Sequence, residues 1–284
     1  TYLKETVLEK LPSRTKEAMC YSLMNGGKRV RPQLLFAALQ HYGMDPKDGF
    51  ACACAIEMIH TYSLIHDDLP AMDDDNFRRG KPTTHKQFNE AIAILAGDSM
   101  LTTAFGLILD DENLPINKRV QLAKNLSFAA GPKGMVSGQM ADIEGESKEL
   151  TLLELQRIHQ QKTGALIEYA VSAGSLIGDI PVNASTALMN YAKHLGLAYQ
   201  IHNDIKDVVY DSHQSGKSAG KDAELEKNTY PSILGLNKAI QQLEDVIKAA
   251  EAEINELSVF VESSAFDMSS LEILKELLDY VRIE

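Results

Sequence analysis

The chain has no tryptophan and only three cysteines in 284 residues. Cys20, Cys52 and Cys54 are an odd number and lack the paired spacing of a zinc site, so neither a disulfide framework nor structural zinc is expected. Cys52 and Cys54 fall in an apolar stretch and are predicted to pack inside the protein. This cysteine usage fits a reducing compartment, and we expect a cytoplasmic protein.

Basic residues are scarce relative to acidic ones. Lys and Arg number 28 against 40 Asp and Glu, which gives a net charge of −12 and a pI of about 5.2. This balance argues against nucleic acid and against an anionic membrane surface as partners. No uncharged apolar run reaches about 18 residues, the length of a membrane-spanning helix, so membrane insertion is not expected.

Strand-like alternation is nearly absent, whereas helical periodicity recurs along the chain. There is no internal repeat and no linker-like change of composition. Clusters of Gly, Pro and small polar residues predict breaks near 25–27, 43–49, 69–84, 110–117, 130–138, 145–150, 178–183 and 212–227. The sequence therefore predicts roughly ten helices in a single all-α domain over residues 1–284.

Two helix starts can be placed from capping residues. Thr151 and Glu154 have the spacing of a capping box and predict a helix that runs to about Ser175. Ser185 is the expected N-cap of another helix, which would run to about Asp211.

Five aspartates lie within residues 67–75, directly after an apolar helical run. Two carboxylates about 4 Å apart repel by roughly 4 kcal/mol in a half-wet site, so a cation is expected between them. Pro70 predicts that Asp67 and Asp68 end the helix and that Asp73 returns to meet them. Oxygen ligands suit Mg²⁺, which completes its shell with water and phosphate oxygens. The alternative is a solvated acidic loop.

A basic segment lies earlier, at residues 26–32. Gly26 and Gly27 allow a tight backbone, and three cations follow within four residues. Lys28 and Arg31 are predicted to lie on one helical face, where an ammonium and a guanidinium suit a diphosphate. A solvated basic turn is the alternative.

Three further residues lie on the helix that leads to the acidic stretch. His60 precedes Asp67 by seven residues and shares its face, as does Ser63. Tyr62 is expected roughly 7 Å down the helix from Asp67. For His60, the alternative is an ordinary core histidine.

Cations also follow the acidic stretch. Arg78 and Arg79 could bind phosphates or form plain surface ion pairs. Lys162 and Thr163 are predicted in the middle of a helix, before Gly164. An exposed lysine is the alternative there.

A second acidic stretch lies at residues 200–211. Asp204, Asp207 and Asp211 fall on one helical stripe, and Asn203 is four residues from Asp207. The stripe is a second candidate cation site, with a solvated face as the alternative. Lys217 follows in a glycine-containing loop.

The order of these motifs strongly resembles the trans-isoprenyl diphosphate synthases, from about Gly26 to Pro231. The stretch Ile59–Lys81 looks most like the bacterial farnesyl diphosphate synthases of that family. The second acidic stretch departs from the family pattern, because Asn203 replaces the usual leading Asp and Lys206 stands where an apolar residue is usual.

The resemblance implies an all-α bundle around a deep central cavity (the isoprenoid synthase fold) that forms a homodimer. It implies two Asp-rich walls that hold about three Mg²⁺ ions, or Mn²⁺ in their place, around an allylic diphosphate. The implied metal ligands are Asp67, Asp68, Asp73, Asp204 and Asp207.

The resemblance also assigns substrate ligands and catalytic residues. The isopentenyl diphosphate ligands would be Lys28, Arg31, His60 and Arg79, and the allylic-diphosphate ligands would be Arg78, Lys162, Thr163, Gln200 and Lys217. The implied catalytic set is Asp67, Asp68, Asp73, Lys162, Thr163, Gln200 and Asp204. Tyr62 and Ser63 would form the floor that limits chain length.

The implied reaction joins isopentenyl diphosphate to dimethylallyl or geranyl diphosphate, giving (2E,6E)-farnesyl diphosphate and diphosphate. It proceeds by Mg²⁺-assisted ionisation, condensation and proton loss. A geranylgeranyl diphosphate synthase is the nearest alternative; a terpene cyclase and an inactive prenyl-diphosphate-binding partner subunit are remote ones. Lys28, Arg31 and His60 argue against the cyclase, which needs no second anion site. Only a synthase consumes isopentenyl diphosphate.

Overall fold

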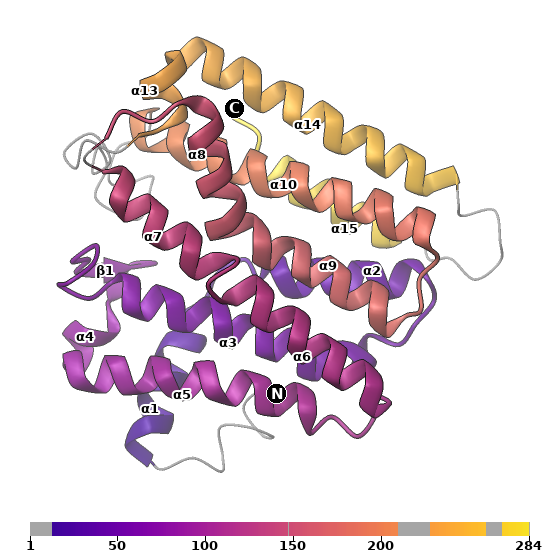
Figure 1. Cartoon of the computed structure of the whole chain (residues 1–284), viewed down its shortest axis with the longest axis horizontal. Coiled ribbons are helices and arrows are strands. Elements are labelled where there is room, and N and C mark those ends of the chain that lie inside the picture. The colour runs from indigo at the N-terminus through magenta and orange to yellow at the C-terminus, as the bar shows by residue number, and fades with distance from the viewer. Residues whose placement is uncertain (1–12, 147, 210–227, 260–268, 284) are drawn as a thin grey trace.

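The computed structural model describes residues 13–146, 148–209, 228–259 and 269–283, and helices dominate it (Figure 1). In chain order the helices are α1 (Ser13–Leu23), α2 (Val30–His41), α3 (Phe50–Asp67), α4 (Thr84–Gln87), α5 (Glu90–Leu109), α6 (Ile116–Ala130), α7 (Met135–Gly145), α8 (Leu152–His159), α9 (Ala165–Ile177), α10 (Val182–Val209), α13 (Tyr230–Leu234), α14 (Leu236–Val259) and α15 (Ser269–Asp279). Short elements are the 3₁₀ turn η3 (Pro46–Gly49), the π turn η4 (Gln160–Gly164) and the strands β1 (Phe77–Arg78) and β2 (Lys81–Pro82). The all-α prediction is confirmed.

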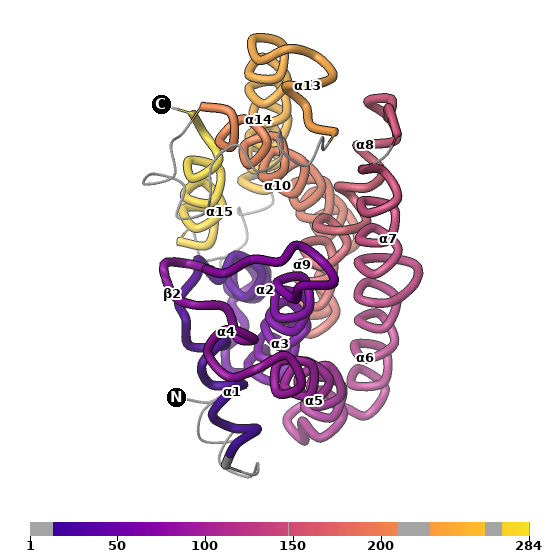
Figure 2. Tube along the Cα trace, turned by 90° about the vertical axis from the view of Figure 1, so that its left-hand side faces the viewer, coloured from indigo at the N-terminus to yellow at the C-terminus, as the bar shows by residue number. Residues whose placement is uncertain are grey.

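Helix α3 is the central element of the bundle. It packs along α5 and also against α2 and α9, and in both views it lies between α5 and that pair (Figure 1, Figure 2). Its closely spaced alanines, such as Ala51, Ala53 and Ala55, favour a helix and let neighbouring helices approach. The second acidic stretch lies on α10, which packs along α14 and crosses α9.

The helix predicted from Thr151 begins as expected and runs to Ile177 without a gap, but it contains a π turn. Thr151 Oγ1 accepts from the Glu154 backbone N–H at 3.3 Å, and Glu154 Oε2 accepts from the Thr151 N–H at 2.8 Å, which confirms the capping box. The π turn η4 then separates α8 from α9, which ends at Ile177 rather than Ser175. π turns are rare and often lie at functional sites, and this one contains Lys162 and Thr163.

Gly138 of α7 lies directly against η4. A Cβ added to Gly138 would stand 2.2 Å from the Lys162 backbone nitrogen, so only glycine fits. Gly138→Ala should push the two backbones apart and lower the free energy of unfolding by about 2–4 kcal/mol, measured by thermal or urea unfolding. Gly106→Ala is the matched control, because nothing lies within 4 Å of its added Cβ. Equal stability of both variants would contradict the tight contact.

One prediction about a helix start needs correction, and one about a helix end stays a prediction. Helix α10 begins at Val182, not after a cap at Ser185; the Ser185 N–H already donates to the Pro181 carbonyl at 2.9 Å, within the first turn. Asp211, the predicted end, and Lys217 lie outside the described residues.

The prediction that no helix is suited to a membrane also needs qualification. Among the described residues one helix, α5, is long and apolar enough to span a bilayer. Its apolar sequence contains no uncharged run of membrane-spanning length because Asp98 lies within it. By itself the finding is weak, since core helices of ordinary bundles pass the same test.

Candidate active site

The first acidic stretch folds back on itself at the end of α3. The Asp73 N–H donates to the Asp67 carbonyl at 2.9 Å, and the Asp75 N–H donates to the Asp68 carbonyl at 3.2 Å. Asp67 is the last residue of α3, so the helix end and the return of Asp73 agree with the prediction made from Pro70.

The carboxyl group of Asp67 is largely buried and lies close to other carboxylates. Burial raises its pKa to about 6, and the neighbouring Asp73 adds to the rise. The positive charge of Lys162 acts the other way and lowers the pKa of Asp67. The Lys162 ammonium, which comes from η4, therefore lies near the Asp67 carboxyl. The Lys162 ammonium also pairs with Asp142 Oδ2 at 2.6 Å. The fold thus brings together Asp67 and Lys162, which are far apart in the sequence.

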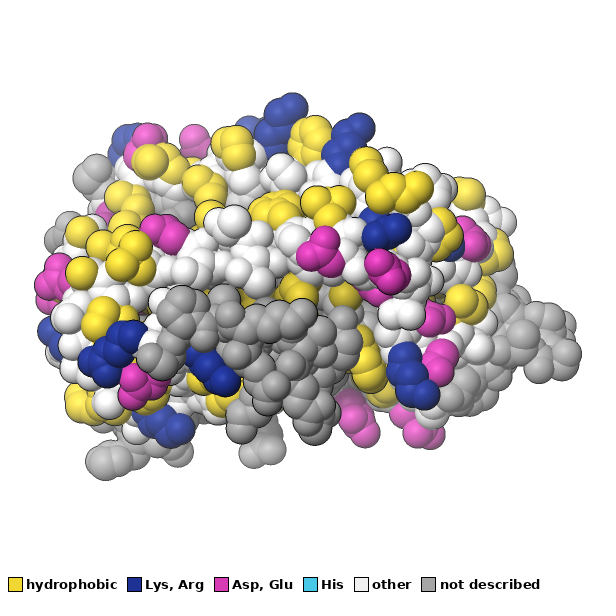
Figure 3. All heavy atoms as spheres, turned by 90° about the horizontal axis from the view of Figure 1, so that it is seen from below, with side chains coloured by type: hydrophobic (Ala, Val, Ile, Leu, Met, Phe, Trp, Pro, Cys, Tyr) yellow, Lys and Arg dark blue, Asp and Glu magenta, His cyan; other side chains and the backbone are white. Residues whose placement is uncertain are grey.

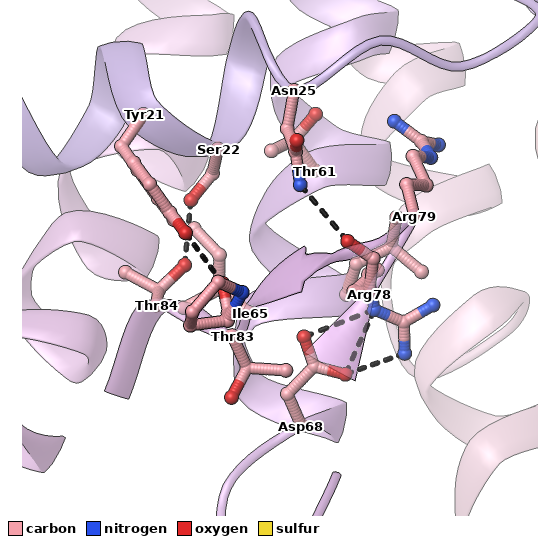
Figure 4. Close-up of a pocket in the computed structure, with 12 residues that line it drawn as sticks. Tyr21, Ser22, Asn25, Thr61, Ile65, Asp68, Arg78, Arg79, Thr83 and Thr84 are labelled. Atoms are coloured by element: carbon pink, nitrogen blue, oxygen red, sulfur yellow. Dashed lines mark hydrogen bonds and ion pairs between the residues drawn. The ribbon is translucent and has the colours of Figure 1, made fainter. Parts of the chain in front are cut away.

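Asp68 has a different environment from Asp67. It is 3% exposed, and Arg78 Nε donates to its Oδ1 and Oδ2 at 2.8 and 2.9 Å (Figure 4). Arg78 Nη2 makes a further bond to Oδ1 at 2.5 Å. The sequence predicted these residues in separate roles, as metal ligand and phosphate ligand. Their pairing fixes the β1 strand against the end of α3.

Three of the four predicted isopentenyl diphosphate ligands come together. Burial and then the charges of Arg31 and Arg79 lower the pKa of His60 well below its usual value, so its imidazole is neutral at pH 7. Burial likewise lowers the pKa of Arg31. Arg31 Nε is buried and has no hydrogen-bond partner among the described residues. A buried cation with an unused donor is suited to an anion.

Lys28 does not share a helical face with Arg31, and that prediction is wrong. Arg29 has φ 53°, in the left-handed region, so α2 begins only at Val30. Contacts that the sequence did not predict explain this geometry: the Arg29 guanidinium binds the Glu57 carboxylate and the Leu23 carbonyl.

The Lys28 ammonium lies over the ring of Tyr280. Burial and then the nearby charge of Lys206 lower its pKa to about 8. Lys28 therefore approaches α10 and the end of α15, and not the side of α2.

Within the described part of the second acidic stretch, which ends at Val209, Asp204 is the buried carboxylate. Asp204 is 7% exposed, and its Oδ2 accepts from the Tyr230 N–H at 2.9 Å. His159 Nε2 lies 3.5 Å from the same oxygen, and the His159 ring stacks on Tyr230. Asp204 thus ties α10 to α13 and α8, whereas Asn203 is exposed. Sequence spacing alone could not distinguish these two faces.

Gln200 lies one turn before Asp204. Its Nε2 is 3.3 Å from His159 Nδ1. Thr163 is buried in η4. His159 and Tyr230 were missed in the sequence, because a lone histidine and a tyrosine before a proline carry no signal without the fold.

Tyr62 and Ser63, which the resemblance predicts to limit chain length, lie on α3. Ser63 Oγ donates to the His60 carbonyl at 2.9 Å. Tyr62 is 7% exposed, and its ring meets the edge of His66 at 5.7 Å between centroids. Gly97 of α5 leaves space for the His66 ring, since an added Cβ would lie 2.2 Å from Nε2.

The carboxylates of Asp67 and Asp73 are suitable ligands for a hard cation. In the part of the chain that the structure describes, no three His, Cys, Asp or Glu side chains form a ready-made metal group. Asp67 and Asp73 are close enough to raise the pKa of Asp67, and a bound cation would relieve that repulsion. Mg²⁺ commonly takes only one or two carboxylates, with water and phosphate oxygens as its other ligands.

Comparison with known proteins gives the family. The polyprenyl synthetase family model matches residues 12–263. The farnesyl diphosphate synthase of Geobacillus stearothermophilus is 52% identical over 250 residues, 87% of this chain and 84% of that protein. The chloroplastic geranylgeranyl pyrophosphate synthase of Capsicum annuum is 41% identical over 281 residues, 98% of this chain and 74% of that protein.

A solved structure agrees in fold. The geranyltransferase of Helicobacter pylori, in complex with magnesium and isoprenyl diphosphate, superposes with a TM-score of 0.85 at 32% identity, covering 99% of this chain and 92% of that chain. Sequence and fold lead to one conclusion: this chain belongs to the polyprenyl synthetase family.

Proposed function

We propose that the protein condenses isopentenyl diphosphate with dimethylallyl or geranyl diphosphate and releases farnesyl diphosphate and diphosphate. The observation that carries the proposal is the meeting of two different ion sites at one end of α3. Asp67 and Asp73 form an acidic site, and Arg31, His60 and Arg79 form a basic one. Two diphosphate substrates need two such sites, one of them with a metal.

The residues divide the chemistry between them. When bound, Mg²⁺ would act as a Lewis acid on the leaving diphosphate, held by Asp67 and Asp73. The cations of Lys162 and Arg78 add positive charge where negative charge develops on that leaving group. Because the Gln200 amide nitrogen faces His159, its oxygen points away from that ring and can face the allylic carbon.

The remaining ligands belong to the same proposal. Asp68, Asp204 and Asp207 assist in holding about three Mg²⁺ ions, and Mn²⁺ substitutes for them. Asp204 would act in part by tying α10 to α13 through the Tyr230 N–H. Thr163, Lys217, Lys28 and Ser63 complete the substrate contacts, of which Lys217 lies outside the described residues.

Asn203 is the departure from the family pattern with a measurable consequence. It is exposed on α10, one turn before Asp207. Asn203→Asp should retain activity and lower the Mg²⁺ concentration at half-maximal rate by about three- to tenfold, because a carboxylate replaces a neutral oxygen. A Mg²⁺ titration of initial rates measures it. A large loss of activity would instead favour the cyclase alternative.

We further propose a cytoplasmic, single-domain homodimer with a deep central cavity. Helix α5 is apolar, but only 33% of its membrane-length window is buried. Exposed apolar side chains of α5 and α6 include Ile94, Leu95, Val120 and Phe128, and the face seen from below carries apolar side chains among charged ones (Figure 3). A second copy would cover such a surface. Sedimentation would measure the assembly.

The reaction is tested with purified protein, labelled isopentenyl diphosphate, and each allylic diphosphate in turn, followed by chromatography of the products. We expect isopentenyl diphosphate consumption that stops with a chelator and a fifteen-carbon product. A twenty-carbon product would identify a geranylgeranyl synthase. Conversion of farnesyl diphosphate alone would indicate a cyclase, and binding without turnover an inactive subunit.

A further inference from the structure

Two hydrogen bonds join Asn25 and the basic segment that follows it to the hairpin of β1 and β2, which carries Arg78 and Arg79. Asn25 Nδ2 donates to the Arg78 carbonyl at 3.1 Å (Figure 4). Arg79 Nη1 donates to the Gly26 carbonyl at 2.5 Å. These two bonds therefore hold together, at the proposed substrate site, segments that are 53 residues apart in the sequence.

The Arg78 carbonyl belongs to the peptide group that precedes Arg79, and this peptide group is under strain. Strands β1 and β2 are joined by Arg79 and Gly80, both with positive φ, of 53° and 75°. Turns of this kind favour Asn or Gly, because a larger L-residue rarely adopts the left-handed region. The surroundings must hold Arg79 in it, and the Asn25 amide fixes the plane of the peptide group on which its φ depends.

The two arginines differ in how their side chains are held. The side chain of Arg78 is only 15% exposed, and Asp68 binds it through three hydrogen bonds. Arg79 is exposed, and it repels the cations of Arg29 and Arg78. Gly27 leaves room for its guanidinium, since an added Cβ would lie 2.5 Å from Cζ. The Arg79 guanidinium has the neutral Gly26 carbonyl as its anchor, whereas Arg78 has the Asp68 carboxylate. The direction of the Arg79 side chain therefore depends more on its backbone than that of Arg78.

The space beside Asn25 cannot take a substrate itself. It is a cavity of about 20 Å³ lined by residues of α1, α3 and the hairpin, among them Tyr21, Thr61 and Asp68 (Figure 4). That volume holds about one water molecule and no prenyl group. Asn25 Oδ1 is buried there without a hydrogen-bond partner among the described residues. The contact between Asn25 and the hairpin therefore positions the neighbouring residues and does not itself bind a substrate.

We propose that Asn25 is a positioning residue that aims Arg79 at the diphosphate of isopentenyl diphosphate. This inference rests on the proposed function. It predicts that the loss of Asn25 weakens one substrate and not the other, since the Arg78 side chain keeps Asp68 as its anchor.

The test compares Asn25→Ala with Tyr21→Phe. Tyr21 OH donates to the Pro82 carbonyl at 2.6 Å, so the control removes a bond to the same hairpin that comes from α1, just before Asn25 in the chain, and lies away from the arginines. Asn25→Ala should raise the KM for isopentenyl diphosphate about tenfold, with kcat and the KM for geranyl diphosphate within about twofold. Tyr21→Phe should change none of them by more than about twofold. Equal rises in both KM values, or an unchanged KM in folded Asn25→Ala, would overturn the proposal.

A double-mutant cycle then tests whether Asn25 acts through Arg79. In an Arg79→Ala background, Asn25→Ala should change the KM for isopentenyl diphosphate by less than about twofold. Effects that multiply would show an independent role and contradict the proposal.

A binding measurement separates this inference from the proposed function. Inorganic diphosphate titrated without Mg²⁺ into wild type and Asn25→Ala should bind about tenfold more weakly to the variant. If wild type consumes no isopentenyl diphosphate, the proposed reaction fails while this measurement still tests Asn25. Equal diphosphate affinities in an active enzyme would refute Asn25 alone.

Discussion

Replacing Asp67 by alanine should reduce turnover by about a thousandfold or more. The carboxylate lies at the end of α3 beside Asp73 and near Lys162, where the metal-bound diphosphate is proposed to leave. A metal stabilises the charge of such a leaving group by several kcal/mol, and each 1.4 kcal/mol corresponds to about tenfold in rate. Initial rates at saturating Mg²⁺ and both substrates measure the effect.

Asp74→Asn is the matched control for this loss. Asp74 belongs to the same acidic stretch but is exposed, and its φ of 45° suits asparagine. It should keep turnover within about threefold of wild type. Near-normal turnover in a folded Asp67→Ala enzyme would remove Asp67 from the metal site.

The pKa of Asp67 gives a second expectation, on stability without metal. Its value of about 6 in the folded protein lies above the usual 3.8. A carboxyl with a raised folded pKa binds its proton more tightly in the native state, so it destabilises the fold as the pH rises from about 4 through 6. In Mg²⁺-free buffer Asp67→Asn should therefore melt at a higher temperature than wild type at pH 7.5. Below about pH 4 the difference should vanish.

Replacing Tyr62 by alanine should shift the product from farnesyl diphosphate towards geranylgeranyl diphosphate or longer chains. Tyr62 lies five residues before Asp67 on the same helix, so a prenyl tail growing from the acidic end would reach it. Its ring is rigid and almost fully buried among core residues, and close-packed interiors contain no spare space for another prenyl unit. Chromatography of the dephosphorylated products measures chain length.

The controls for Tyr62 separate space from stability. Tyr62→Phe keeps the ring and should still give farnesyl diphosphate. Tyr62→Ala should cost about 3 kcal/mol of unfolding free energy, because it removes most of a buried ring. Farnesyl diphosphate as the sole product of a folded and active Tyr62→Ala enzyme would show that another side chain limits the length.

Local chemistry made the acidic end of α3 predictable. Pro70 cannot continue a helix, and the repulsion among Asp67, Asp68 and Asp73 required a cation or solvent nearby. The capping box at Thr151 was equally local. The helix end, the return of Asp73 and the capping box depend on residues within one or two turns of each other, and the structure has these three as the sequence suggested.

The features that were missed depend on contacts between distant segments. Lys28 does not share a helical face with Arg31, because Arg29 has a left-handed conformation and its guanidinium binds Glu57, 28 residues away. Asp204 is buried because the Tyr230 N–H needs an acceptor, and spacing on a helix cannot show which stripe meets another element. The pairing of Asp68 with Arg78 likewise appears only once the hairpin folds over the helix end.

The π turn between α8 and α9 has a consequence for how this chain can vary in length. Such a turn holds one residue more than an α-helical turn in the same rise, so deleting a residue from Gln160–Gly164 would leave an uninterrupted helix. The faces of α8 and α9 would then rotate by about 100° relative to each other. Either Lys162 would leave the acidic site or the apolar face of α9 would leave α2. A surface loop can lose a residue without rotating its neighbours, whereas a deletion in this segment would move one of two helix faces away from its contacts.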